Sequence, residues 1–155
     1  MTPLTYRDAT SSDLPTIVAM LAEDQIGGRA DDPREPLASP YVAAFDAIHA
    51  DPAHRLIVVE TNGAILGTMQ LTLLPGLLNH GAWRGQIEAV RVAAAHRSGG
   101  IGEQMIDWAV DWFRAHSCFV AQLTSNNDRV AAHRFYQRLG WAKSHAGFKL
   151  YLETA

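Results

Sequence analysis

Polar and apolar residues alternate with two different periods along the chain, and the changes of period mark its predicted elements. Residues 4–10 alternate and carry Thr and Tyr, which predicts a short first strand. Residues 11–23 present apolar side chains on one side of a helix, with Ser11 or Ser12 as its expected cap. A loop rich in Gly, Pro and Asp then leads into a second, short helix over residues 40–50.

The clearest pattern is a β-hairpin in the middle of the chain. Residues 56–60 and 64–74 form its predicted strands, and Asn62-Gly63 between them is the strongest short turn signal. After a further loop, "QIEAVRVA" at residues 86–93 is another predicted strand.

The last third of the chain alternates helices and strands. The predicted elements are a helix over 103–116, a strand over 118–124, a helix over 129–139, and two final strands over 141–144 and 147–153. Hairpin-linked strands followed by strand–helix–strand indicate an α+β fold rather than the regular alternation of a doubly wound sheet.

The composition narrows the class of protein. The 155 residues fit one domain, 1–155, of a soluble globular protein with 48% hydrophobic and 19% charged residues. A net charge of −3 disfavours nucleic acid as a partner. The chain shows no apolar stretch long enough for a membrane helix, no signal peptide and a single cysteine, so we expect a cytoplasmic protein with no membrane partner.

Three glycines follow an arginine in "RSGGIG", residues 97–102, between a predicted strand and a predicted helix. A helix start exposes unpaired N–H groups and the positive end of the helix dipole, and residues without side chains let an anion approach them. Arg97 and His96 would add positive charge there. On these residues alone, a phosphate site and a tight turn without a ligand are equally good interpretations.

The segment "VRVAAAHRSGGIGEQMIDWAVDWF" resembles motif A of the GCN5-related N-acetyltransferase (GNAT) family, whose Gln/Arg-x-x-Gly-x-Gly/Ala signature matches Arg97, Gly100 and Gly102. "AAHRFYQRLGW" resembles motif B of the same family. The resemblance covers nearly the whole chain. It implies a three-layer α/β/α fold with a central mixed, mostly antiparallel sheet that is splayed at the acetyl-CoA site.

The resemblance also implies where acetyl-CoA binds as a co-substrate. Its pantetheine arm would pair with the backbone of Val90, Arg91 and Val92 like an added strand, beside a bulge that opens the cleft. The N–H of Val92 would face the developing oxyanion. The pyrophosphate would lie on the backbone N–H groups of the glycine-rich turn, which comprises Arg97, Ser98, Gly99, Gly100, Ile101 and Gly102.

Two residues are candidates for proton transfer. Tyr136 lies where the family often has a tyrosine, and the resemblance implies that its hydroxyl is the acid for the leaving thiolate; a core tyrosine is the alternative. Strand alternation places Glu88 on the same side as Val90 and Val92, where burial would raise the pKa of its carboxyl group toward that of a useful general base. A solvated glutamate, or one paired with Arg84, is the alternative.

After the fifth strand the family often has an asparagine that contacts the pantetheine arm, and this role would fall to Asn127 or its neighbour Asn126. The usual spacing from the tyrosine lands on Arg129 instead, which would face the CoA phosphates or solvent. Turn and helix-cap roles are therefore the favoured interpretation of both asparagines.

Three further features are interpreted structurally. Cys118 is expected to be a buried thiol, because no histidine partner is indicated. The seven histidines lack metal-ligand spacing, so no metal is predicted. Trp108 and Trp112 are expected to pack a helix against the sheet.

The sequence says least about the amine acceptor. Two loops, residues 23–35 and 73–85, are expected to flank its cleft, with His80 and Trp83 as candidate cleft residues. Carboxylates that would attract a cationic amine, or simply be solvated, are Asp24, Asp31, Asp32 and Glu35. Small-molecule and peptide amines both stay open.

These features predict an acetyl-CoA-dependent N-acetyltransferase that moves the acetyl group directly to a primary amine in a ternary complex. A non-catalytic acyl-CoA-binding regulatory module is the main alternative, and a nucleotide-binding α/β protein is a second. Members of the family often dimerise, and the apolar residues 147–153 are a candidate contact for a homodimer.

Overall fold

A computed structural model describes residues 3–23 and 25–152 of the chain. The chain divides into two compact units, Met1–Leu123 and Thr124–Ala155, each of which is described by itself. This division does not test whether the chain functions as one domain, so the single-domain prediction stays a prediction.

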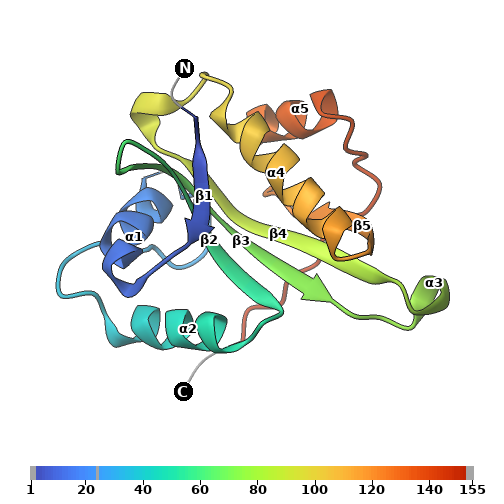
Figure 1. The fold of residues 1–155 in the computed structure, drawn as a ribbon, viewed down its shortest axis with the longest axis horizontal. Helices are drawn as coiled ribbons and strands as arrows, with labels where there is room; N and C mark the ends of the chain where they lie inside the picture. The colour runs from blue at the N-terminus through green and yellow to red at the C-terminus, as the bar shows by residue number, and fades with distance from the viewer. Residues whose placement is uncertain (1–2, 24, 153–155) are drawn as a thin grey trace. The chain divides into compact units, whose positions relative to one another are not determined.

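The first unit is built on one mixed five-stranded sheet (Figure 1). Its strands lie in chain order; the first four are antiparallel neighbours, and the fifth runs parallel to the fourth. This confirms the predicted α+β fold with a mostly antiparallel sheet. The strands are β1 (Thr5–Asp8), β2 (His54–Thr61), β3 (Ala64–Leu74), β4 (Trp83–Val92) and β5 (Cys118–Leu123).

The long helices of the first unit lie where the sequence pattern predicts them, and among the described residues three short helical segments accompany them. They are η1 (Ser11–Asp13), α1 (Leu14–Ala22), α2 (Ser39–Ala50), α3 (Leu78–Gly81), η2 (Ala94–His96) and α4 (Ile101–Ala115). The start of α1 differs from the prediction, because Asp13 rather than a serine precedes its first residue. The Asp13 carboxylate accepts the N–H of Thr10 at 2.7 Å and so closes the η1 turn.

Helix α4 covers one face of the sheet, along β4 and β5 (Figure 1). Two glycines allow this contact: a Cβ on Gly67 would lie 2.8 Å from Met105 Sδ, and one on Gly85 would overlap the ring of Phe113. Trp108 stacks on Tyr6 of β1 with ring centroids 4.9 Å apart. The prediction that the helix tryptophans are packing residues is therefore confirmed for Trp108.

The opposite face is covered by α2 next to β2 and by α1 next to β3 and β4. Its apolar core contains Leu14 and Ile17 of α1, Phe45 of α2 and Val58 of β2. With α4 on the other side, the first unit has the three predicted layers.

The second unit contains the predicted helix as α5 (Val130–Arg138). The two strands predicted to follow it are wrong, because residues 141–152 carry no strand; Glu153 lies outside the described residues. A strand needs a hydrogen-bonded neighbour, and alternation of side chains predicts only the propensity to form one.

A network of charges ties β1 to the start of α1. Arg7 reaches Asp13 at 2.7 Å and Glu60 of β2 at 2.9 Å, and the Asp13 side chain is only 10% exposed. The guanidinium group of Arg7 lowers the pKa of the Asp13 carboxyl group from 3.8 to about 2. Because this pKa is lower in the folded state, the pair stabilises the fold above about pH 4, and this contribution disappears as the pH falls from about 4 to 2.

We predict that Asp13→Asn lowers the free energy of unfolding by about 2 kcal/mol at pH 7, a size that follows from the pKa shift. Urea unfolding of both proteins at pH 7 and at pH 2 measures it, and the gap should narrow at the lower pH. Asp8→Asn is the control, because Asp8 pairs with Arg55 at 2.8 Å but is 56% exposed. It should cost less than about 1 kcal/mol. Equal losses in the two variants would contradict the prediction.

Candidate active site

Strand β4 carries a bulge that sequence reasoning did not locate. Thr68 of β3 pairs with Arg91 and Gln70 pairs with Glu88, so two residues of β4, Ala89 and Val90, stand opposite one residue of β3. Ala89 has φ 53°, a left-handed conformation that residues with a side chain rarely adopt. A bulge in this strand was implied by the family resemblance, but no glycine marks its position.

The bulge reverses the predicted side of Val92. Register pairs Val92 with Gly67, which faces α4, whereas Glu88 pairs with Gln70 and so points to the opposite face. The prediction that Glu88 shares a side with Val92 is therefore wrong, because the extra residue shifts the alternation by one. Arg91, paired with Thr68, shares the face of Glu88 instead.

Glu88 itself is exposed. Among residues 3–23 and 25–152 its carboxylate has neither a hydrogen-bond nor an ion-pair partner, and the alternative pairing with Arg84 is not formed. The burial on which its predicted role as a base depended is thus not present in this structure.

Strand β5 leaves half of β4 uncovered. It pairs with β4 only over Trp83 to Ile87, so residues 88–92, called the open edge below, have no strand neighbour on that side among the described residues. Ala93 N–H donates to Leu66 O of β3 at 2.8 Å. Because successive N–H groups of a strand point to opposite edges, the Val92 N–H points to the open edge.

Two arginines contact carbonyl groups at this edge. Arg91 Nη1 donates to Val90 O at 2.9 Å, and Arg97 Nε donates to Val92 O at 3.0 Å. Arg97 also lies 3.4 Å from the carboxylate of Glu23, the residue after α1. The first residue of the glycine-rich turn is therefore held against the end of the open edge.

The glycine-rich turn opens α4 in the predicted way. Gly100 is the residue before the helix and has φ 78°, and Ser98 also has positive φ. At the start of α4, the N–H of Gln104 donates to Gly100 O at 3.2 Å. The amides of residues 101–103 precede this bond and have no acceptor within the helix. A Cβ on Gly100 would meet no atom within 4 Å, so an anion has room above this turn.

The second unit carries the remaining predicted site residues. Tyr136 lies on α5, half-buried, with ring centroids 5.1 Å from Phe135 and 5.9 Å from Trp141. Asn126 accepts the N–H of Asp128 at 2.9 Å and so stabilises the turn before α5. Arg129 precedes the first residue of α5. A turn role for Asn126 is confirmed, while contacts of Asn127 or Arg129 with CoA stay predictions.

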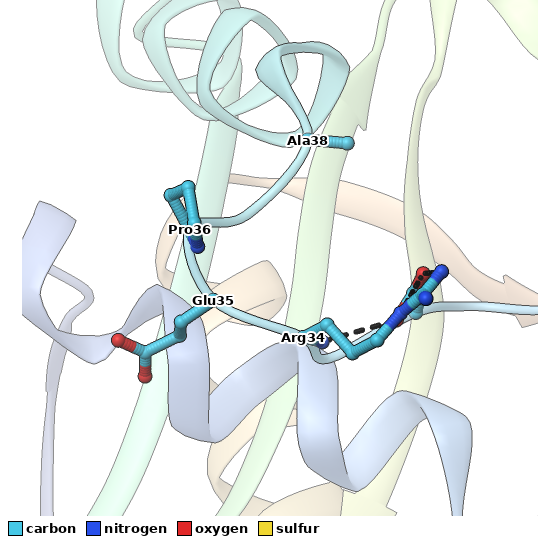
Figure 2. Close-up of a pocket in the computed structure, with 5 residues that line it drawn as sticks. Arg34, Glu35, Pro36 and Ala38 are labelled. Atoms are coloured by element: carbon cyan, nitrogen blue, oxygen red, sulfur yellow. Dashed lines mark hydrogen bonds and ion pairs between the residues drawn. The ribbon is translucent and has the colours of Figure 1, made fainter.

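The loop before α2 satisfies most of its own charges. Asp31 accepts the hydroxyl of Tyr41 at 3.0 Å, and the Arg34 guanidinium lowers the pKa of Asp32 to about 2. A pocket of about 330 Å³ lies here, as Figure 2 shows with Arg34 turned toward its hydrogen-bond partner and Glu35 turned away. The pocket is lined by Asp32, Arg34, Glu35, Pro36 and Ala38. None of these belongs to the open edge or the turn, and Asp24 lies outside the described residues.

The β3–β4 loop contains a short helical segment, α3, that the sequence pattern did not predict. Asn79 and His80 both adopt left-handed conformations within α3, and Trp83 begins β4 with 43% exposure. Within the part of the chain that the structure describes, no contact places His80 at the open edge. Cys118 is half-buried beside Trp83, and burial raises the pKa of its thiol, as expected for a structural cysteine.

Two negative findings apply to the described part of the chain alone. No group of three or more His, Cys, Asp or Glu residues there could hold a metal ion. None of its helices has both the length and the apolar character needed to cross a membrane.

Comparisons with known proteins agree with this geometry. A relative from Salmonella typhimurium (strain LT2), an aminoalkylphosphonate N-acetyltransferase, is 28% identical over 92% of this chain and 87% of its own. A crystal structure of a transcriptional regulator from Bacillus halodurans C-125 is 39% identical, with a TM-score of 0.92 over 97% of this chain and all of that one. Glucosamine-6-phosphate N-acetyltransferase from Arabidopsis thaliana, 19% identical, shares the fold with a TM-score of 0.77 over 97% and 99% of the two chains.

A family model assigns the chain directly. It matches residues 19–141, most of the chain and both sequence motifs, and carries the description "Acetyltransferase (GNAT) family". The chain therefore belongs to the GNAT family of acetyltransferases and is an N-acetyltransferase.

Proposed function

We propose that this protein transfers an acetyl group directly from acetyl-CoA to a primary amine in a ternary complex. The observation that carries the proposal is the junction between the open edge of β4 and the glycine-rich turn, which the Arg97–Val92 hydrogen bond of 3.0 Å holds together. An unpaired strand edge fits an extended amide-containing arm, and a helix start with open space above Gly100 fits a pyrophosphate.

Acetyl-CoA supplies the activated thioester, and the chain's own residues position and stabilise the reacting groups. Val92 N–H, directed to the open edge, would donate to the carbonyl oxygen as negative charge develops on it. Arg97 and the amides of residues 101–103 would hold the phosphates. Ser98, Gly99, Ile101 and Gly102 contribute backbone to this turn, and we propose that Val90 and Arg91 pair with the pantetheine arm.

The transfer needs two proton movements. The amine nitrogen forms a bond with the acetyl carbon and gives up a proton, while the carbon–sulfur bond breaks and the sulfur takes one up. We propose that Glu88 accepts the proton of the amine, directly or through water. Its exposed carboxylate lies next to the bulge at the open edge. We propose that the hydroxyl of Tyr136 donates the proton that the sulfur takes up.

We propose a small-molecule amine as acceptor and a single functional domain over residues 1–155. The similar Salmonella protein is named for aminoalkylphosphonates, which are small amines. The family match runs from residue 19 to residue 141 and so includes parts of both compact units.

One finding favours a second function, the regulatory module. The 39% identical Bacillus halodurans protein is called a transcriptional regulator. Release of free thiol from acetyl-CoA in the presence of amines separates the two functions, because a purely regulatory module binds CoA without turnover.

We predict that Gly100→Glu reduces affinity for CoA at least tenfold, because it places a negative side chain where the phosphates would lie. Calorimetric titration with CoA measures this. Gly63→Glu is a closely matched control, because Gly63 also has a positive φ (77° against 78°) and open space around its Cβ but lies in the β2–β3 turn. Equal CoA affinity in the two variants would contradict the proposal that the CoA phosphates bind at Gly100.

We predict that Tyr136→Phe lowers kcat at least tenfold while KM for acetyl-CoA changes less than twofold, because only the proton donor is lost. Steady-state assays at saturating amine measure it. Tyr151→Phe, an exposed tyrosine of the same unit, should leave both constants unchanged. Unchanged turnover in Tyr136→Phe removes the acid assignment.

We predict that Glu88→Gln lowers kcat by about 100-fold, a typical loss for a general base, with CoA affinity retained. The amide keeps the size of the side chain but accepts no proton at neutral pH. Asp111→Asn is the control, since Asp111 is a 72% exposed carboxylate on α4. Full activity in Glu88→Gln would assign deprotonation of the amine to another group.

A further inference from the structure

The sheet face opposite α4 changes character between its two halves. Under α1 and α2 it is apolar, around Val58 and Leu56 of β2. Farther along the same face, β3, β4 and β5 present polar and charged side chains instead. We call this set the polar strip; its members are Gln70, Arg84, Gln86, Glu88 and Gln122.

Register aligns the polar strip across the strands. Gln86 of β4 stands beside Gln122 of β5 and Thr72 of β3, and His54 of β2 continues the row. Gln122 Nε2 donates to Gln86 Oε1 at 2.7 Å, and the His54 ring shares a hydrogen bond of 3.0 Å with the Thr72 hydroxyl. Both glutamines are half-buried and held in place, and the Gln86 amide retains N–H groups for a ligand.

The two charges of the polar strip lie on either side of this row. Arg84 and Glu88 are each two residues from Gln86 on the same strand face, and their Cα atoms are therefore about 14 Å apart. Neither has a partner for its charge among the described residues, and this separation prevents a direct ion pair between them. The strip is thus positive at one end and negative at the other, with amide groups between.

The order of the residues along β4 determines which end of the polar strip lies next to the open edge. Glu88 comes directly before the bulge, so the negative end of the strip lies next to the open edge that ends at Val92. Arg84 lies at the far end, between Leu74 of β3 and Val120 of β5. An acceptor amine that reaches the open edge can therefore extend its remaining atoms along the strip toward Arg84.

We propose that the acceptor is a small amine that also carries an oxyanion, and that Arg84 binds this oxyanion beside the Gln86–Gln122 pair. The inference rests on the proposed function and specifies the substrate class of the same site. A guanidinium group binds phosphonate, phosphate and carboxylate with paired hydrogen bonds, and the ammonium of the same molecule complements Glu88. Arg91 shares this face, but its guanidinium donates to Val90 O at 2.9 Å. Arg84 is therefore a specificity residue and takes no part in the transfer itself.

The experiment compares amines that differ in the group at their far end. The probes are 2-aminoethylphosphonate, O-phosphoethanolamine and β-alanine, with ethanolamine as the neutral amine and 1,4-diaminobutane as the dication. We expect kcat/KM to be 10- to 100-fold higher for at least one anionic amine than for ethanolamine, the range of one charge-assisted hydrogen-bonded pair. The order among the three anionic amines shows which oxyanion fits.

Two variants assign the preference to Arg84. Arg84→Gln should remove the 10- to 100-fold advantage by raising KM for the anionic amines, with the rate for ethanolamine changed less than twofold. Arg84→Lys, which keeps the charge without the planar fork, should restore part of it. Arg114→Gln is the control, because Arg114 is a 73% exposed arginine on α4, over the opposite face.

The inference is overturned if ethanolamine or 1,4-diaminobutane is acetylated as well as the anionic amines, or if Arg84→Gln lowers all rates equally. If no amine is acetylated, calorimetric titration of 2-aminoethylphosphonate and ethanolamine into the CoA-saturated protein decides. Preferential binding of the phosphonate, lost in Arg84→Gln, supports the inference even if the proposed turnover fails. Equal or absent binding of both amines overturns it, whatever the affinity for CoA.

Discussion

The hydrogen-bonding requirement of β4 is the constraint on which the candidate site depends. Backbone N–H and C=O groups must find partners, and a strand inside a sheet normally finds them on both edges. Strand β5 supplies them only from Trp83 to Ile87. Beyond that point the chain uses side chains, with Arg91 on the Val90 carbonyl and Arg97 on the Val92 carbonyl. Carbonyls are thereby satisfied by arginines, while the Val92 N–H stays directed to the open edge.

The bulge at Ala89 belongs to the same constraint. One extra residue in β4 turns the Val92 side chain to the face of α4 and leaves Glu88 on the opposite face, while the Val92 N–H lies in the plane of the sheet and points to the open edge. An amine attacks the carbonyl carbon from above or below the thioester plane, whereas the carbonyl oxygen and its N–H donor lie close to that plane. A regular strand would place both residues on one face. The left-handed conformation of Ala89 costs about 1 kcal/mol or more, and the surrounding pairing must hold it in place.

These features explain which predictions could succeed. The strands of the hairpin and the long helices follow from the period of apolar residues, which is a local property of the chain, and Asn62-Gly63 marks its turn chemically. The bulge has no such mark, because Ala89 is not a residue that favours positive φ, and alternation carried through it assigns Val92 to the wrong face. The tail after α5 shows the reverse error, since its alternation predicts strands while a strand depends on a partner that the local sequence does not encode. The Gln86–Gln122 hydrogen bond depends on a register between distant strands, which is not a local property either.

The glycine-rich turn can act on the open edge only if α4 keeps a fixed position over β4. Two glycines of the sheet provide this. Met105 of α4 sits where a Cβ of Gly67 would be, 2.8 Å from its sulfur, and Phe113 occupies the place above Gly85 two turns further along the helix. Contacts at two points along α4 determine both its distance from the sheet and its direction. The N-terminal amides of the helix are thus positioned relative to Val92 by side chains that never touch a ligand. Loss of turnover after enlarging Gly85 would for this reason reflect displacement of the turn, even though Gly85 lies outside the site.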